Sequence, residues 1–191
     1  MLLILIPGRY NSYCFNAALF ISSLTFILSL IMWLIFDSGH NSFQFLCTID
    51  WLPAFNFYYT VGVDGISLFF LILTTFLIMV CVLISWGSIN YRLKEYLINF
   101  LLLEFLLIQV FSVLDLLLFY VFFESILMPM FLIIGIWGSR ERKIRAAYQF
   151  FLYTLVGSVL MLLGILIIYS HGGTTDLQML WNLEKKKKKQ I

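Results

Sequence analysis

The chain has 191 residues, of which 62% are hydrophobic and only 12% are charged. Soluble domains average about 45–50% apolar and about 25% charged residues, so this composition excludes a water-soluble globular protein and predicts an all-α integral membrane protein. The formal net charge of +2 is small, and no basic face with interleaved aromatic residues supports nucleic-acid binding.

Transmembrane spans are predicted wherever about 20 apolar residues follow one another, because that length of helix crosses a hydrocarbon core of about 30 Å. After a short N-terminal segment over residues 1–14, the sequence predicts a bundle of about five transmembrane helices. The predicted spans are 15–36, 66–86, 96–113, 115–137 and 146–170.

Residues 96–137 are too long for one crossing, and a turn near 112–115, the least apolar point, divides them into two. The last span ends at the glycines of "HGGTTD", which favour the end of a helix. A basic tail over residues 171–191 follows.

The connection over residues 37–65 is rich in aromatic side chains. The partial alternation of "SFQFLCTIDW" predicts a short hairpin at the membrane interface, where Trp and Tyr are favoured. We expect this outer loop to be part of the architecture rather than a site.

Charges in the loops predict the orientation of the bundle. Apart from the C-terminal run, the basic residues are Arg9 and the Lys and Arg side chains of the loops 87–95 and 138–145. The loop 37–65 contains no Lys or Arg. By the positive-inside rule the basic loops face the cytoplasm or matrix. The lysine run 185–189 then falls on the outer side, against the rule. Either the tail is tolerated there, as a solvated terminus or because more protein would follow, or the number of helices is not five.

No motif for binding a nucleotide, flavin, iron–sulfur cluster or zinc is visible, since GxGxxG, P-loop and HExxH patterns are all missing. Cys14, Cys47 and Cys81 are too far apart for a CxxC pair, and we expect them to be small buried side chains. The chain is therefore expected to bind no cofactor and no metal of its own.

Two glutamates are predicted to lie deep in the membrane. Glu104 is eight residues from Tyr96 and Glu124 nine from Asp115, which at about 1.5 Å per residue gives depths of about 12 and 14 Å. A charge at that depth costs at least about 2.5–3.5 kcal/mol, and such residues mark ion or proton paths. Burial favours the protonated form of an acid, and a nearby cation favours its ionised form. An acid subject to both effects can take up and release a proton near neutral pH.

Glu124 and Glu104 are therefore candidate proton-relay residues, and the alternative is a neutral, hydrogen-bonded acid that ties two helices together. Pro129 adds to the case for Glu124, because a proline inside a helix frees the carbonyl of Ser125 and permits a hydrated pocket there. A plain packing kink explains Pro129 equally well. Asp115, at the turn, is interpreted as a turn or N-cap residue.

Three stretches carry a resemblance to a known family: "VGVDGISLFF", "FYVFFES" and "GTTDLQ". Residues 20–180 resemble the chain 4 family of NADH:ubiquinone oxidoreductase (respiratory complex I), in its mitochondrial form. The resemblance implies the N-terminal part of an antiporter-like subunit of the mitochondrial inner membrane, which translocates protons when a distant redox arm reduces quinone. It also implies that NADH, FMN, iron–sulfur clusters and ubiquinone belong to other subunits of this NADH:ubiquinone reductase.

The family's functional glutamate on its fifth helix falls on Glu124, whereas the resemblance assigns no acid to the position of Glu104. The family's first helix appears here only as its last residues, and its seventh helix, with the lysine that pairs with the glutamate, is missing. We therefore expect the other membrane-arm subunits as partners, and a separate polypeptide that supplies the remaining half; a truncated gene product is the other explanation.

Two other functions remain open. The chain could belong to a related cation/proton antiporter without a redox partner. It could also be a purely structural half-subunit of the membrane arm in which Glu124 is neutral and packed.

Overall fold

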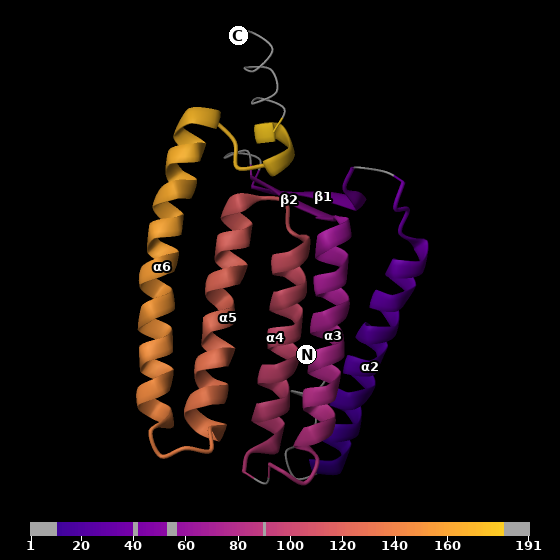
Figure 1. The fold of residues 1–191 in the computed structure, drawn as a ribbon, viewed down its shortest axis with the longest axis vertical. Helices are drawn as coiled ribbons and strands as arrows, with labels where there is room; N and C mark the ends of the chain where they lie inside the picture. Colours follow the sequence, from indigo (N-terminus) through magenta and orange to yellow (C-terminus); the bar gives the residue numbers. More distant parts are fainter. Residues whose placement is uncertain (1–10, 40–41, 53–56, 90, 182–191) are drawn as a thin grey trace.

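The fold is an up-and-down bundle of apolar helices. The structure is a computed structural model, and it describes residues 11–39, 42–52, 57–89 and 91–181. Five helices within these residues are long and apolar enough to cross a membrane, so the chain is a multi-pass membrane protein (Figure 1). They are α2 (Asn11–Ile35), α3 (Gly65–Ser85), α4 (Leu93–Ser112), α5 (Leu116–Trp137) and α6 (Lys143–Gly172).

Each predicted span corresponds to one of these helices, but three helices begin three or four residues earlier than predicted. α2 begins at Asn11 rather than at residue 15, so residues 11–14 belong to the helix and not to a separate N-terminal segment. α4 and α6 begin at Leu93 and Lys143, three residues before their predicted starts. Hydropathy detects the apolar part of a helix, whereas the backbone hydrogen bonds continue through polar residues into the interface.

The C-terminal end also differs from the predicted division. Residues 171–172 complete α6, and Gly173 ends it with φ 68° as its C-cap, in the left-handed region that glycine favours. A helical turn follows over residues 177–181. The lysine run 185–189 and residues 1–10 lie outside the described residues.

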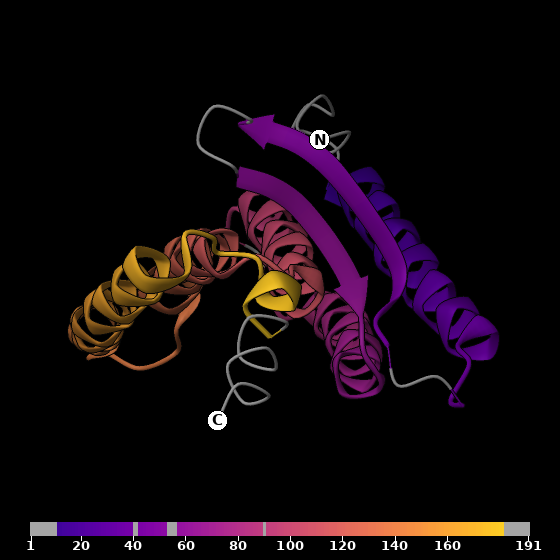
Figure 2. The same cartoon turned by 90° about the horizontal axis from the view of Figure 1, so that it is seen from above.

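The helices pack as a three-helix core with two helices added at one side. α2, α3 and α4 contact one another, α5 packs on α4, and α6 packs on α5. Seen from above, α3, α4, α5 and α6 form a row, with α2 against its α3–α4 end (Figure 2). The main apolar cluster joins the first three helices through Cys14, Phe15, Ala18, Ile78, Val82, Leu93, Leu97 and Leu103.

A two-stranded hairpin lies across the outer ends of α3 and α4 (Figures 1 and 2). Its strands, β1 (Gln44–Leu52) and β2 (Phe57–Val63), are antiparallel, and Thr48 pairs with Thr60. The predicted hairpin is therefore confirmed. Phe45 has φ 55° where the register shifts between Gln44 and Cys47, which is a β-bulge.

The hairpin is attached to α4 and to the α4–α5 turn. The Tyr59 phenol donates a hydrogen bond to Gln109 of α4, and burial raises the pKa of Tyr59, which keeps the donor proton in place. The amide of Leu114 donates to the carbonyl of Thr60 over 2.9 Å. The turn between Ser112 and Leu116 lies where the sequence predicts it, and it is held from above by β2.

Candidate functional site

The two membrane-embedded acids lie at the same level of the bundle. From Ser112, the end of α4, back to Glu104 is eight residues, and from Leu116, the start of α5, to Glu124 is also eight. At about 1.5 Å per residue, each acid is about 12 Å below the turn that joins these antiparallel helices. Each acid therefore lies near the middle of its helix, which is where the sequence predicts it.

Glu104 is buried against α2. Its side chain is only 3% exposed, and the Thr25 hydroxyl of α2 donates to its Oε1 over 2.5 Å. The same hydroxyl is 2.9 Å from the carbonyl of Ser22 in its own helix. A buried carboxyl is stable in an apolar interface only when its oxygens find such donors, so Thr25 explains how α2 and α4 accommodate the acid.

Thr25 belongs to a row of hydroxyls on α2 that the sequence does not single out as a site. Ser22, Thr25 and Ser29 are spaced three and four residues apart and therefore share one face of the helix. Ser29 and Thr75 of α3 are joined by a hydroxyl–hydroxyl hydrogen bond of 3.0 Å, and both side chains are buried. A polar seam, defined here as Ser22, Thr25, Ser29, Thr75 and Glu104, runs between α2, α3 and α4.

The signal that could have found this seam is the spacing of its hydroxyls. In an otherwise apolar span these hydroxyls lower the mean hydropathy only slightly. Their spacing of three and four residues also indicates that they share one face of the helix. That period shows a shared face but cannot show which other helix the face contacts. The partnership of Thr25 with Glu104 therefore comes from the packing alone.

Glu124 has a different environment from Glu104. The residue is partly buried, yet its Oε2 is a buried atom with no hydrogen-bond partner among the described residues. A buried polar atom left without a partner costs about 1–3 kcal/mol, and more when it is charged. This oxygen therefore requires a proton, a water molecule or a cation from outside the described chain.

Ser125 directly follows Glu124 in α5, and Pro129 lies just over one turn further along the helix. Pro129 is fully buried inside the helix, and its ring removes the hydrogen bond that the carbonyl of Ser125 would accept. The Ser125 hydroxyl donates a separate hydrogen bond to the carbonyl of Val121 over 2.7 Å. The hydrated pocket predicted beside Glu124 stays a prediction.

Asp115 is the N-cap of α5, which is the role that the sequence favours. Its Oδ1 accepts hydrogen bonds from the amides of Leu117 and Leu118 over 2.9 and 3.0 Å. Its Oδ2 accepts from the Thr175 hydroxyl over 2.6 Å. The residue is buried, so it joins the α4–α5 turn to the segment after α6 rather than to the two glutamates.

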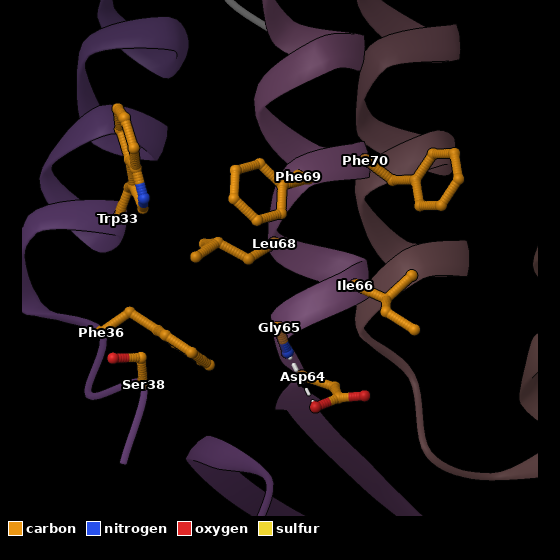
Figure 3. Close-up of a pocket in the computed structure, with 9 residues that line it drawn as sticks. All are labelled: Trp33, Phe36, Ser38, Asp64, Gly65, Ile66, Leu68, Phe69 and Phe70. Carbon is orange, nitrogen blue, oxygen red and sulfur yellow. Dashed lines mark hydrogen bonds between the residues drawn. The ribbon is translucent and has the colours of Figure 1, made fainter. Parts of the chain in front are cut away.

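A pocket of about 740 Å³ lies away from the acids, between the outer ends of α2 and α3. Figure 3 shows Trp33 and Phe36 on one side, Phe69 and Leu68 on the other, and Asp64 at the start of α3. Asp64 accepts a hydrogen bond from the amide of Gly65 over 2.7 Å and caps this helix. The pocket therefore belongs to the interface at the helix ends and not to the level of Glu104 and Glu124.

The cysteines differ from their expected burial in two positions. Cys14 is buried, but Cys47 is exposed on β1 and Cys81 is only partly buried. Cys47 is exposed because its strand lies outside the bundle. Within the described ranges, no three His, Cys, Asp or Glu side chains are grouped so that they could hold a metal ion.

Comparison with known proteins gives one family. Residues 113–191 match the family described as NADH:quinone oxidoreductase/Mrp antiporter, TM. The chain is 64% identical over 190 residues to NADH-ubiquinone oxidoreductase chain 4 of Chondrus crispus, covering 100% of this chain and 39% of that relative. Chain 4 of Arabidopsis thaliana is 54% identical over 191 residues, again covering 100% of this chain and 39% of the relative. The chain thus spans about two fifths of the length of these relatives.

Solved structures share the fold. A chain of respiratory complex I from Thermus thermophilus with bound NADH aligns with a TM-score of 0.74 and 30% identity, over 85% of this chain and 33% of that chain. A chain of the Mrp complex from Dietzia sp. DQ12-45-1b aligns with a TM-score of 0.76 over 91% of this chain and 19% of that chain, at 16% identity, which shows the fold alone. Over its full length, the chain is thus similar to the NADH-ubiquinone oxidoreductase chain 4 family of antiporter-like membrane subunits.

Proposed function

We propose that this chain forms part of a proton-translocating membrane subunit of respiratory complex I, in which Glu124 is a protonatable relay residue. The sequence identity to chain 4 of several eukaryotes, which extends over the whole of this chain, supports this assignment. The structural similarity to a complex I chain from Thermus thermophilus also supports it. The eukaryotic source of these relatives supports a location in the mitochondrial inner membrane.

The observation that carries the relay role is the buried Oε2 of Glu124, which lacks a hydrogen-bond partner in the described part of the chain. Glu104 differs, because the Thr25 hydroxyl donates a hydrogen bond to its carboxyl group. Glu124 instead keeps one oxygen free for a proton, a water molecule or a cation that arrives from outside.

The cation that would pair with Glu124 must come from another part of the assembly. In this sequence no Lys or Arg occurs in residues 10–91, 95–139 or 146–184. We propose that this cation lies on a separate polypeptide of the membrane arm or on further residues of the same subunit. Glu104, held in the polar seam at the same level, is a second candidate on the proton path.

The electrons follow a different route in this proposal. NADH, FMN, the iron–sulfur clusters and ubiquinone are bound by other subunits, and this chain contributes to NADH:ubiquinone reductase only through proton translocation. The candidate groups in its membrane-embedded part are carboxyls and hydroxyls, which move protons and not electrons.

Co-purification tests the membership in complex I. A tag on this chain in its native membrane is expected to recover flavin- and iron–sulfur-containing proteins with NADH dehydrogenase activity. Recovery of antiporter subunits without any redox protein would contradict the proposal and favour a cation/proton antiporter.

Replacement of Glu124 tests the relay. In the assembled complex, Glu124→Gln is expected to abolish proton pumping through this subunit, measured as NADH-driven acidification of the opposite vesicle compartment, while assembly survives. Glu95→Gln is the matched control, because Glu95 is an exposed acid that pairs with Arg92 at the membrane surface. Undiminished pumping in an assembled Glu124→Gln complex would leave the acid with a structural role only.

A further inference from the structure

The inner end of α6 has two adjacent hollows that the proton path does not use. One has a volume of about 280 Å³ and is lined by Arg142, Arg145, Ala146 and Gln149. The other is a shallow, open hollow of about 680 Å³ on the face of α6, with an almost wholly apolar lining of Phe150, Leu152, Tyr153 and Val156, together with Gln149. Because Gln149 lines both, a cationic hollow continues into an apolar one along the same helix.

The two arginines in this place have no partner within the described residues. Neither the Arg142 nor the Arg145 side chain makes an ion pair or hydrogen bond there. Two neighbouring cations at the same membrane surface are engaged: Arg92 pairs with Glu95 at 3.3 Å, and Lys143 Nζ donates to the carbonyl of Ile136 over 2.6 Å. Two free guanidinium groups at one hollow form a site for an anion, and guanidinium binds phosphate in a bidentate manner.

The spacing of the lining residues places both hollows on one stripe of α6. Arg142, Arg145, Gln149, Tyr153 and Val156 follow one another at intervals of three and four residues, which share a helix face. Val156 lies eleven residues beyond Arg145, or about 16 Å deeper in the membrane. The cationic end is therefore at the inner surface, and the apolar end reaches toward the middle of the hydrocarbon core.

We propose that this stripe of α6 binds an anionic phospholipid, with its phosphate on Arg142 and Arg145 and an acyl chain in the apolar hollow beside Tyr153 and Val156. Basic pockets of transmembrane helices on the matrix or cytoplasmic side suit anionic headgroups. A soluble phosphate would use only the cationic hollow, whereas a phospholipid matches the length, charge and polarity of both. The site is independent of the proposed proton relay.

Lipid selectivity of the full chain tests this site. The chain is reconstituted in phosphatidylcholine nanodiscs with a trace of spin-labelled phosphatidylglycerol or spin-labelled phosphatidylcholine, and the motionally restricted fraction gives the relative affinity. The unmodified chain is expected to prefer phosphatidylglycerol. Arg142→Gln/Arg145→Gln should lower that preference about tenfold, and each single variant about threefold, because each surface cation contributes to binding an anionic lipid.

The matched control is Arg92→Gln/Arg140→Gln, which removes two positive charges from the same membrane surface but none from the hollow. This variant should keep most of the preference. An equal loss in the two double variants would reduce the effect to general surface charge and overturn the site, as would the lack of any preference in the unmodified chain. Displacement of the labelled lipid by inorganic phosphate would also overturn it, by assigning the arginines to a soluble anion.

Discussion

Glu104 and Glu124 lie at the same level of the bundle and differ in what surrounds them. Glu104 is buried and accepts a hydrogen bond from Thr25 of α2, which lies 79 residues earlier in the sequence. Glu124 keeps a buried oxygen without a partner in the described chain. The first acid therefore helps to join helices, whereas the second is available for a group that comes from outside.

The Thr25–Glu104 bond should contribute measurably to stability. Thr25→Val keeps the shape of the side chain but removes the donor, and an unsatisfied buried acceptor costs about 1–3 kcal/mol. Thr74→Val is the matched control, because the Thr74 hydroxyl bonds only to the carbonyl of Leu71 in its own helix. Unfolding of the detergent-solubilised full chain by SDS measures both variants, and equal stability of the two would refute the role of this bond.

At the scale of elements, the short connections limit which substitutions the bundle tolerates. Gly138 is the C-cap of α5 before the turn into α6. A Cβ atom at this position would lie 2.4 Å from the carbonyl oxygen of Ile134 and 3.0 Å from Cβ of Lys143. Because a backbone oxygen cannot move away as a flexible side chain can, the connection between α5 and α6 requires glycine here.

Gly138→Ala should therefore destabilise the chain by about 1–3 kcal/mol, the usual cost of overpacking. Gly157→Ala, in the exposed middle of α6, meets no atom within 4 Å of the added Cβ and should be neutral or stabilise by up to about 1 kcal/mol, since alanine favours helix. Thermal unfolding of both variants in one detergent gives the comparison. A neutral Gly138→Ala variant would show that the turn adjusts at little cost.

Helices and the outer hairpin could be predicted from the sequence because each depends on a local pattern. Runs of apolar residues predicted the five spans, and partial alternation in residues 42–51 predicted the hairpin whose first strand is β1. The early starts of α2, α4 and α6 were missed because hydropathy does not detect polar helical turns. The bond between Thr25 and Glu104 was missed because it depends on which helices are neighbours.

At the scale of the whole molecule, the two ends of the bundle differ in charge and structure. The loops that contain Arg92, Arg140 and Arg142 lie at one end, and the hairpin, without Lys or Arg, lies at the other (Figure 1). The positive-inside rule therefore assigns the hairpin to the outer side of the membrane. The same assignment places the two free arginines of α6 at the inner surface.

Thiol labelling can test this orientation directly. Cys47 is exposed on β1 and should react with a membrane-impermeant maleimide only from the outer side of sealed vesicles. In a Cys47→Ser background, Ser139→Cys places a thiol in the exposed α5–α6 loop and should react only from the inner side. Cys47→Ser without the second change is the control for background, and labelling of both positions from one side would contradict the topology.

The central claim is that Glu124 changes its protonation while the assembled complex turns over. Redox-induced infrared difference spectroscopy detects this change in the carbonyl stretch of protonated carboxylic acids. We expect a band in the unmodified complex that disappears in Glu124→Gln and persists in the surface control Glu95→Gln. A Glu124→Gln complex that assembles and gives the same difference spectrum as the unmodified complex would contradict the claim.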